Sequence, residues 1–227
     1  MKKYAVIVAG GSGKRMGSTI PKQFLELKGK PILMHTLEHF FLADNEISLL
    51  VVLPKAHIPT WTSLCQERQF TIPHIIIEGG KERFFSVKNG LDKISDKKAI
   101  VAIHDGVRPF VSVATIRNSY HQTETLKATT LAVDLKDSIR LVEGTSSKSV
   151  DRNLYKLIQT PQTFEISLIK KAYEQSFSTT FTDDASVVEA MGHKVHLIDG
   201  DYENIKITSP EDLIFGEAIL KSHNQGE

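Results

Sequence analysis

Short runs of apolar residues recur along the chain, and several are followed by stretches with helical spacing. The runs expected to form strands cover residues 4–9, 47–53, 73–77, 99–104, 128–133 and 194–198. Apolar positions at helical spacing occupy residues 31–41, 59–69 and 113–124. Runs that are apolar on both faces are typical of a parallel sheet covered by helices. The pattern predicts an α/β fold whose central strand is the most apolar run, residues 99–104.

This alternation of strands and helices is interrupted after residue 133. Residues 137–143 alternate polar and apolar positions, residues 144–147 have the composition of a turn, and residues 149–158 are again extended. We interpret residues 137–157 as a hairpin-like excursion, the β-arm. Such an excursion is marginally stable alone and exposes unpaired strand edges. Its expected cover is the same segment of a second chain, in a homodimer with two-fold symmetry.

After the β-arm the chain is expected to return to the main body. Residues 160–164 (TPQTF) resemble a loop, and residues 182–189 have the cap and early acids of a helix start. A closing amphipathic helix is expected at residues 209–221. Neither a linker nor a repeat divides the sequence, so residues 1–227 are predicted to form a single domain.

The composition is that of an ordinary globular protein of 227 residues, 41% hydrophobic and 24% charged. Lys plus Arg number 28 and Asp plus Glu 27, so the net charge of +1 favours neither nucleic acid nor a membrane surface. The lone Cys65 excludes an internal disulfide and a cysteine-rich zinc site. With no signal-peptide core and no membrane-length apolar run in the sequence, a cytoplasmic location is expected.

A glycine-rich loop follows the first predicted strand directly. Its sequence is AGGSGKRMG, with glycines at Gly10, Gly11 and Gly13. Glycines let a ligand approach the bare main chain, and consecutive backbone N–H groups can converge on phosphate oxygens. Arg15 and Lys22 then add two cations beside a bound polyphosphate. The loop therefore predicts a phosphate cradle.

Two better-known glycine motifs compete with this interpretation. A P-loop needs a glycine five residues before the Gly-Lys pair and Ser or Thr after it, but Val8 and Arg15 stand there. A dinucleotide fingerprint is nearly matched, yet the next strand ends in VLP, without the acid that would hold a ribose. A plain glycine turn with two solvated cations is the remaining alternative.

Polar residues also follow two later strands, where ligands sit in open α/β sheets. A second Gly-Gly turn at residues 79–80 is placed to meet the first. The hydroxyl of Ser86 either contacts a base or ribose, or caps a helix. Asp105 is placed to hold a sugar hydroxyl or a magnesium ion, and Arg108 offers a fork for a phosphate. Alternatively, Asp105 and Arg108 form a salt bridge within the turn.

Two further pairs have spacings compatible with a metal ion. His35 and His39 lie four residues apart without a third ligand, so histidines at the surface or in helix packing are the preferred interpretation. Asp183 and Asp184 either bind a metal or act as favourable acids in the first turn of a helix.

Seven motifs, in order, resemble the bacterial 2-C-methyl-D-erythritol 4-phosphate cytidylyltransferases of the non-mevalonate isoprenoid pathway. They are AGGSGKRMG, PKQF, GGKERFFSV, HDGVRPF, VDRNLYKLIQTPQTF, TDDAS and NIKITSPEDL, and they span nearly the whole chain. The resemblance implies a Rossmann-like nucleotidyltransferase domain with a mostly parallel sheet, flanking helices and a protruding β-arm that clasps a partner in a homodimer. It also implies a magnesium-dependent (Mg2+) transfer of the cytidylyl group of CTP to methylerythritol phosphate, with release of pyrophosphate.

The resemblance assigns roles motif by motif. The implied catalytic residues are Arg15 and Lys22, which would neutralise the triphosphate and the transition state, and Arg152 and Lys206, which would steer the attacking phosphate. The implied nucleotide-binding residues are Ala9, Gly10, Gly11, Gly13, Gly80, Lys81, Ser86 and Asp105, with Asp105 also near the metal. The implied substrate-binding residues are Arg108, Ser138, Thr160 and Thr182.

Three positions depart from the pattern expected of the family. Lys81 stands where many members are expected to have Asp, which puts the contacts to the base in question. Ser138 stands where Thr is common, and Gly106 replaces a small alanine. The last two changes are chemically mild.

Two rival functions remain. A related cytidylyltransferase that acts on ribitol 5-phosphate shares the cradle and the PKQF motif, but the VDRN and TDDAS motifs favour the isoprenoid enzyme. A non-catalytic nucleotide-binding regulator on the same fold would bind CTP without turning it over. The presence of Arg15, Lys22, Arg152 and Lys206 together argues against such a regulator.

Overall fold

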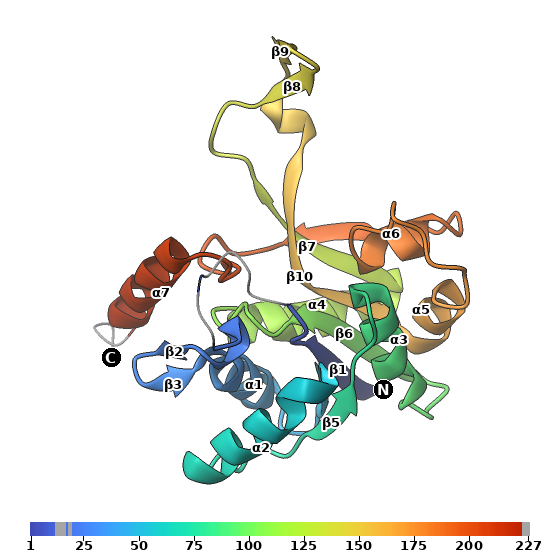
Figure 1. Ribbon diagram of the computed structural model, residues 1–227. Helices are drawn as coiled ribbons and strands as arrows, with labels where there is room; N and C mark the ends of the chain where they lie inside the picture. The colour runs from blue at the N-terminus through green and yellow to red at the C-terminus, as the bar shows by residue number, and fades with distance from the viewer. Residues whose placement is uncertain (12–16, 18–19, 224–227) are drawn as a thin grey trace.

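A seven-stranded sheet forms the centre of the molecule in the computed structural model, which describes residues 1–11, 17 and 20–223 (Figure 1). The order is β11-β7-β10-β6-β1-β4-β5, and β10 alone runs antiparallel to its neighbours. The strands are β1 (Lys2–Val8), β4 (Ser48–Leu53), β5 (Ile75–Glu78), β6 (Ala99–Asp105), β7 (Ala128–Asp134), β10 (Lys156–Glu165) and β11 (His196–Asp199). The predicted α/β fold with β6 at its centre is therefore confirmed.

Helices cover both faces of the sheet (Figure 1). One face carries α1 (Ile32–Ala43), α2 (Ile58–Glu67) and α4 (Val113–Leu126), and the other carries α3 (Arg83–Asp92), α5 (Ile166–Ala172) and α6 (Asp184–Glu189). The C-terminal helix α7 (Pro210–His223) packs beside the short hairpin of β2 (Glu26–Leu27) and β3 (Lys30–Pro31). Among the described residues, no helix combines the length and apolar character that a membrane span requires.

The apolar run of β1 shows why the sheet is buried on both sides. Ala5 and Ile7 pack in the core beneath α1 and α4, whereas Val6 and Val8 pack in the core beneath α3. Successive side chains of a strand point to opposite faces, so a strand between two helix layers needs apolar residues at every position. The end of β1 is thereby held in the middle of the sheet, where the glycine-rich loop begins.

Strand β10 corrects the expectation of a loop at residues 160–164. This segment lies inside the sheet between β6 and β7, and all of its residues are buried. Two of its polar side chains find partners there: Thr160 Oγ1 accepts from the Asp105 N–H at 3.0 Å, and Gln162 Nε2 donates to Thr130 Oγ1 at 2.9 Å and to Asp183 Oδ2 at 2.8 Å. Pro161 falls where the pairing with β7 is irregular, between Gln159 and Gln162. Local polarity predicted a loop, but long-range hydrogen bonds make the segment a strand.

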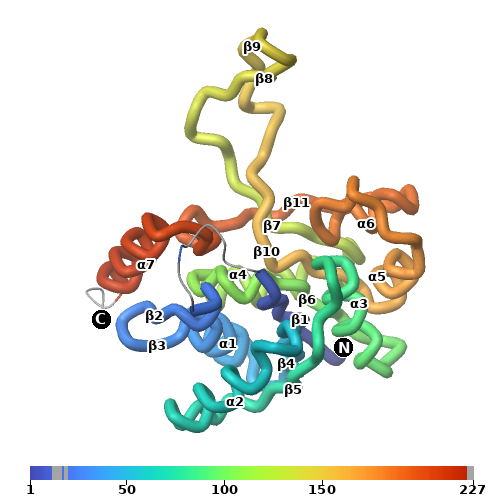
Figure 2. Tube along the Cα trace, in the orientation of Figure 1, coloured from blue at the N-terminus to red at the C-terminus, as the bar shows by residue number. Residues whose placement is uncertain are grey.

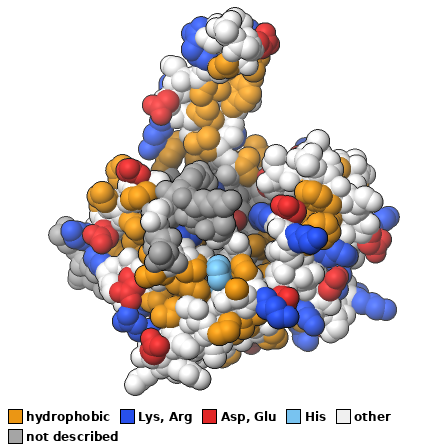
Figure 3. Space-filling view, in the orientation of Figure 1, with side chains coloured by type: hydrophobic (Ala, Val, Ile, Leu, Met, Phe, Trp, Pro, Cys, Tyr) orange, Lys and Arg blue, Asp and Glu red, His pale blue; other side chains and the backbone are white. Residues whose placement is uncertain are grey.

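The predicted β-arm is present and projects away from the body (Figure 2). Its tip is the hairpin of β8 (Arg140–Glu143) and β9 (Ser146–Ser149), whose residues are all exposed. Its base is formed where β10 begins, since Lys156 and Leu157 pair with Asp134 and Val133 of β7. Most of the large hydrophobic side chains of the arm are exposed, and Figure 3 shows them along its length.

The paired histidines of α1 contact the backbone. The Nε2 atom of His35 lies 3.0 Å from the carbonyl oxygen of Leu27, and the Nδ1 atom of His39 lies 2.7 Å from that of Val111. Each ring therefore ties α1 to a neighbouring segment. The interpretation as packing histidines is confirmed.

Candidate active site

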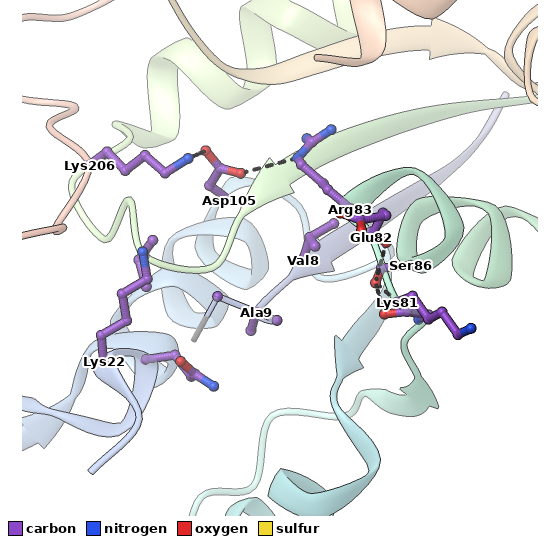
Figure 4. A pocket seen from close by; sticks show the side chains of 14 residues that line it. Val8, Ala9, Lys22, Lys81, Glu82, Arg83, Ser86, Asp105 and Lys206 are labelled. Atoms are coloured by element: carbon purple, nitrogen blue, oxygen red, sulfur yellow. Dashed lines mark hydrogen bonds and ion pairs between the residues drawn. The ribbon is translucent and has the colours of Figure 1, made fainter. Parts of the chain in front are cut away.

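The candidate active site is a cavity of about 340 Å³ at the carboxyl ends of β1 and β6. This volume lies within the range of small-molecule sites. Figure 4 shows side chains from separate segments facing it. The lining residues are Val8, Ala9, Gly10, Gly11, Lys22, Gln23, Gly80, Lys81, Glu82, Arg83, Ser86, Asp105, Val107 and Lys206. The structure thus brings together nine of the residues that the sequence assigned to catalysis or nucleotide binding.

Lys22 is fixed on the cradle side of this cavity. A Cβ atom added to Gly11 would lie 2.9 Å from the Cε atom of Lys22, so the absence of a side chain at Gly11 lets the lysine approach the main chain. Lys22 begins a 3₁₀ turn, Lys22–Phe24, whose Phe24 ring stacks on Trp61 of α2 with centroids 6.0 Å apart. Next to it, Gln23 Nε2 lies 3.1 Å from His57 Nδ1. The lysine therefore stands on a packed element.

The second Gly-Gly turn forms the opposite wall. The Gly80 N–H donates to Ser86 Oγ at 3.1 Å, and the Ser86 hydroxyl lies 3.2 Å from the carbonyl oxygen of Glu82. A Cβ atom at Gly80 would lie 2.3 Å from Phe85 Cβ, so only glycine fits this turn. Ser86 thus holds the turn together from inside the first turns of α3, although its side chain also lines the cavity. In Figure 4 the side chain of Lys81 points away from Asp105 and Lys206.

Asp105 lies at the end of β6 among three cations. Its carboxylate oxygens are 2.8 Å from Lys206 Nζ, 3.6 Å from Arg108 Nε and 3.7 Å from Arg83 Nε. Burial by itself would raise the pKa of Asp105, but the positive charges of Arg83, Lys206 and Arg108 outweigh it and hold this pKa well below its usual range. Asp105 is therefore ionised at every physiological pH, and the predicted salt bridge to Arg108 is one of its three ion pairs.

Lys206 reaches this cluster because its segment is tied to the turn after β6 and to the middle of β10. The Ile207 N–H donates to the carbonyl oxygen of Val107 at 2.9 Å, and the Asn204 side-chain amide donates to that of Thr160 at 2.9 Å. Arg108 Nη1 donates to the carbonyl oxygen of Asn204 at 2.8 Å. These bonds place a segment far along the chain beside the end of β6.

A second cavity of about 180 Å³ adjoins the first. It is lined by Arg83, Asp105, Arg108, Ile158, Gln159, Thr160, Gln162, Thr182, Asp183 and Lys206. Three predicted substrate-binding residues, Arg108, Thr160 and Thr182, therefore meet here. The two cavities share Arg83, Asp105 and Lys206 as a common wall.

A buried histidine holds the common wall in place. His104 Nε2 lies 3.1 Å from the carbonyl oxygen of Arg108, and His104 Nδ1 lies 3.2 Å from Thr160 Oγ1. Thr160 Oγ1 accepts a hydrogen bond of 3.0 Å from the Asp105 N–H. Burial lowers the pKa of His104 to about 3, so the ring is neutral and donates through Nε2 while it accepts from Thr160. The ring thereby joins β6, β10 and the turn after β6.

Arg83 lines both cavities, and the sequence alone did not single it out. It stands inside the GGKERFFSV motif, but no role was assigned to it. Its two Nη atoms donate to the two carboxylate oxygens of Asp184 at 2.8 and 2.6 Å. Its position in the first turn of the helix after the second Gly-Gly turn was the available signal. Its partner, 101 residues further along the chain, could not be read from the sequence.

The acidic pair at the start of α6 is engaged in structural contacts. Asp183 caps the helix in a capping box with Ser186, and Asp184 is fully buried against Arg83. Among the described residues, no group of three or more His, Cys, Asp or Glu side chains is arranged to hold a metal ion. The interpretation of Asp183 and Asp184 as first-turn acids is therefore the one that the geometry supports.

Among the described residues, two predicted site residues stand apart from the cavities. Ser138 and Arg152 are exposed on the β-arm, and Arg152 Nη1 donates to the carbonyl oxygen of Lys136, the residue just before the arm. The predictions for Gly13 and Arg15 lie outside the described residues. Of the three departures, Gly106 has a steric reason: a Cβ atom there would lie 3.0 Å from atoms of Ala9 and Leu33.

A mostly parallel sheet with a glycine-rich loop after β1, a cationic wall and two adjoining cavities defines the class of Rossmann-like nucleotidyltransferases. Within this class the comparison with known families is specific. The family model described as 2-C-methyl-D-erythritol 4-phosphate cytidylyltransferase matches residues 4–222. The chain belongs to this family.

Individual relatives match this chain over nearly their whole length. The 2-C-methyl-D-erythritol 4-phosphate cytidylyltransferase of Bacteroides thetaiotaomicron is 50% identical over 220 residues, which are 97% of this chain and 100% of the relative. The crystal structure of 4-diphosphocytidyl-2C-methyl-D-erythritol synthase from Anaerococcus prevotii superposes with a TM-score of 0.82 at 29% identity, covering 96% of each chain. The Thermus thermophilus cytidylyltransferase superposes with a TM-score of 0.78 at 28% identity, covering 96% of this chain and 98% of that one.

Proposed function

We propose that this chain transfers the cytidylyl group of CTP to 2-C-methyl-D-erythritol 4-phosphate, giving 4-diphosphocytidyl-2-C-methyl-D-erythritol and pyrophosphate. The observation behind the proposal is the shared wall of the two cavities. The larger cavity is lined by the glycine loops and has room for a nucleotide, and the smaller one adjoins it at Asp105 and Lys206. A phosphate monoester in the smaller cavity would therefore face the phosphates of a nucleotide in the larger one.

The reaction needs positioning and positive charge from the protein. The acceptor phosphate is already an anionic nucleophile, so no general base is required. Its oxygen attacks the α-phosphorus of CTP in line, a new P–O bond forms, and the bond to pyrophosphate breaks. Charge grows on the oxygens of the α-phosphate and of the leaving group. Lys22, on the cradle side, and Lys206, on the shared wall, stabilise that charge.

Arg15 and Arg152 complete the proposed catalytic set on the evidence of their motifs. Arg15 would act beside Lys22 on the triphosphate, and Arg152 would steer the attacking phosphate together with Lys206. Ala9, Gly10, Gly11, Gly13, Gly80, Lys81, Ser86 and Asp105 would surround the nucleotide. Arg108, Ser138, Thr160 and Thr182 would contact the acceptor.

We include magnesium in the proposal because Asp105 fits the way this ion is held. Mg²⁺ is commonly bound by one or two carboxylates together with substrate phosphates, and it retains several waters. Asp105 is ionised and faces both cavities, so it would hold the ion together with nucleotide phosphates. A bound ion would neutralise phosphate charge. Chelation of divalent cations should abolish turnover, and added magnesium should restore it; full activity in the chelator would remove the ion from the proposal.

The functional unit is proposed to be a homodimer joined by the β-arm. The arm exposes Val142 and Leu154 at 67% and 80% of their full accessible area, and large exposed apolar surface is typical of an interface. Arg152 lies in this arm, at the 3₁₀ turn Arg152–Leu154. In a dimer it would complete the active site of the neighbouring subunit. The cytoplasmic location expected from the sequence stays a prediction.

The decisive experiment measures pyrophosphate release from CTP with methylerythritol phosphate and, separately, with ribitol 5-phosphate. Release with the first acceptor only is expected. Preference for the second would make the protein a ribitol phosphate cytidylyltransferase, the alternative that the family match does not favour. Binding of CTP without release with either acceptor would indicate a regulator.

A further inference from the structure

A bidentate ion pair joins the starts of two helices, at residues that lie 101 positions apart in the chain. Arg83 is the first residue of α3, and Asp184 is the first residue of α6. Two parallel N–H···O bonds of 2.8 and 2.6 Å connect their side chains. Bidentate pairs fix the relative orientation of their partners as well as their distance.

Asp184 depends on this contact. Its side chain is fully buried, and Tyr173 Oη donates a further hydrogen bond of 2.5 Å to Oδ1. A buried carboxylate is costly unless it is paired and hydrogen-bonded, and loss of its partner leaves an uncompensated charge. Burial lowers the pKa of the Arg83 guanidinium, but the Asp184 carboxylate outweighs this effect and raises that pKa above its usual range.

The geometry of Arg83 differs from that of a phosphate-binding arginine. Both Nη atoms are directed to Asp184, and Nε lies 3.7 Å from Asp105 on the shared wall. Two carboxylates therefore orient the guanidinium, and their negative charges compensate its positive charge. Lys22 and Lys206 are the lysines on the cavity wall that we assign to phosphate charge, whereas Arg83 connects parts of the protein.

The connected parts are walls of different cavities. Gly80, Lys81 and Glu82 precede Arg83 directly and line only the larger cavity. Thr182 and Asp183 precede Asp184 directly and line only the smaller one. The ion pair thus holds the loop beside the nucleotide against the loop beside the acceptor, next to Asp105.

We infer that Arg83 is a positioning residue that sets the alignment of the two substrates by clamping the nucleotide loop to the acceptor loop. The inference rests on the proposed function. A misplacement of about 1 Å between reacting groups can cost about 100-fold in rate. Loss of the clamp is therefore expected to reduce kcat and raise the KM for the acceptor, while CTP alone still binds.

The first test is Arg83→Lys, which keeps one positive charge but cannot form the fork. Its kcat should fall by about 30-fold to 100-fold, the scale of a small misalignment, while its Kd for CTP without acceptor should stay within about threefold of wild type. A kcat equal to that of wild type would overturn the inference. A Kd for CTP that rises as much as kcat falls would also overturn it, because Arg83 would then be a nucleotide ligand.

The second test separates alignment from stability. Arg83→Gln alone leaves Asp184 without its cation, so we pair it with Asp184→Asn, which exchanges the ion pair for two neutral amides. The double variant should fold, with a Tm close to that of wild type, and should keep the low kcat of Arg83→Lys. Recovery of kcat to the wild-type value in the double variant would show that the ion pair of Arg83 and Asp184 serves stability only. The inference would then be wrong.

Two control variants belong to the same experiment. Tyr173→Phe removes a donor to Asp184 but leaves the fork, so it should lower Tm without a comparable loss of kcat. Lys88→Ala removes an exposed ion pair with Asp92 on the same helix and should leave kcat unchanged. Turnover by the wild-type protein separates the two claims. Its absence would defeat the proposed function, whereas wild-type turnover with an unaffected Arg83→Lys would defeat the inference alone.

Discussion

The cavity wall and the β-arm both contribute residues to the proposed reaction, yet they are built in opposite ways. On the wall, Asp105 and Thr160 are buried, and hydrogen bonds or ion pairs from other segments hold them. On the arm, Ser138 and Arg152 are exposed, and Arg152 Nη1 donates to the carbonyl oxygen of Lys136, the residue just before the arm. The named wall residues are thus held by contacts within one chain. The arm instead exposes most of its side chains to solvent.

The difference shows two ways of placing a charged side chain. Lys22 and Lys206 are positioned by packing and backbone hydrogen bonds of their own subunit, so their reach is fixed before any partner arrives. A cation on a two-stranded arm has no comparable support, because such hairpins are marginally stable alone. A second subunit would supply that support, so the conformation of the arm should depend on the proposed dimer.

The largest effect is expected at the wall. Lys22→Ala should leave the fold intact and reduce turnover by about 100-fold to 1,000-fold, as the loss of one preorganised donor does elsewhere. Steady-state pyrophosphate release and far-UV circular dichroism measure the two properties. Lys55→Ala, an exposed lysine that makes an ion pair of 3.7 Å with Glu78, is the matched control. Unchanged turnover in Lys22→Ala would remove this residue from its role.

The second effect concerns Arg152 of the arm and the subunit in whose active site it acts. Arg152→Ala should also lower turnover by about 100-fold, whereas Arg140→Ala, which changes an arginine that bonds Ser147 within the arm, should not. Equal mixing of Arg152→Ala chains with Lys22→Ala chains should restore about a quarter of wild-type activity, because half of the dimers would contain one intact site out of two. If mixed dimers form and stay inactive, Arg152 does not act across the interface.

A third experiment asks whether the exposed apolar surface of the arm is an interface. Leu154→Asp, together with Val142→Asp, should shift the protein from dimer to monomer in sedimentation velocity runs and lower turnover with it. Ile214→Asp is the control, because Ile214 is 70% exposed on α7. A dimer that survives the arm substitutions but is lost in the control would move the interface to α7.

The histidine contribution to the pH dependence of the free energy of unfolding should come from the body of the molecule, because the arm has no histidine. The folded-state pKa of His104 is about 3, below its unfolded value of about 6.5, so the unfolded chain binds the extra proton. The free energy of unfolding should therefore fall as the pH drops below about 6.5, by about 2 kcal/mol at pH 5 from this residue.

Urea denaturation between pH 7 and pH 4.5 measures this slope. His104→Gln should make the slope shallower, while His121→Gln, at an exposed position, should not change it. Burial also lowers the pKa of His35, so part of the slope should persist in His104→Gln. An unchanged slope would show that the ring of His104 is already accessible to protons in the folded state.

The smallest effect is expected at Lys81. Its side chain points away from Asp105 and Lys206 (Figure 4), and the adjacent Gly80 lines the cavity. Lys81→Asp should therefore alter the preference of CTP over UTP by at most about fivefold, because an exposed charge contributes up to about 1 kcal/mol. Competition between the two nucleotides gives the ratio. A larger change would assign base recognition to this side chain.

The sequence by itself determined the elements whose signal is local. Apolar runs fixed β1, β4, β6 and β7, because a strand covered by helices on both faces needs apolar residues throughout. The change of rhythm after residue 133 located the β-arm, and the glycine loops located the cavity, because ligands meet parallel sheets at the carboxyl ends of strands. Ordered motifs identified the family.

Only the tertiary structure decided what depends on partners distant in the chain. Residues 160–164 form a buried strand in which Thr130, Asp105 and Asn204 hydrogen-bond to Gln162 and Thr160, and no local pattern contains that information. Asp184 is a core ion partner because Arg83 comes to it across 101 residues. Asp105 is held ionised by three cations that come from three separate segments. Hydrogen bonds and ion pairs act through space, so their pairing appears only when the chain has folded.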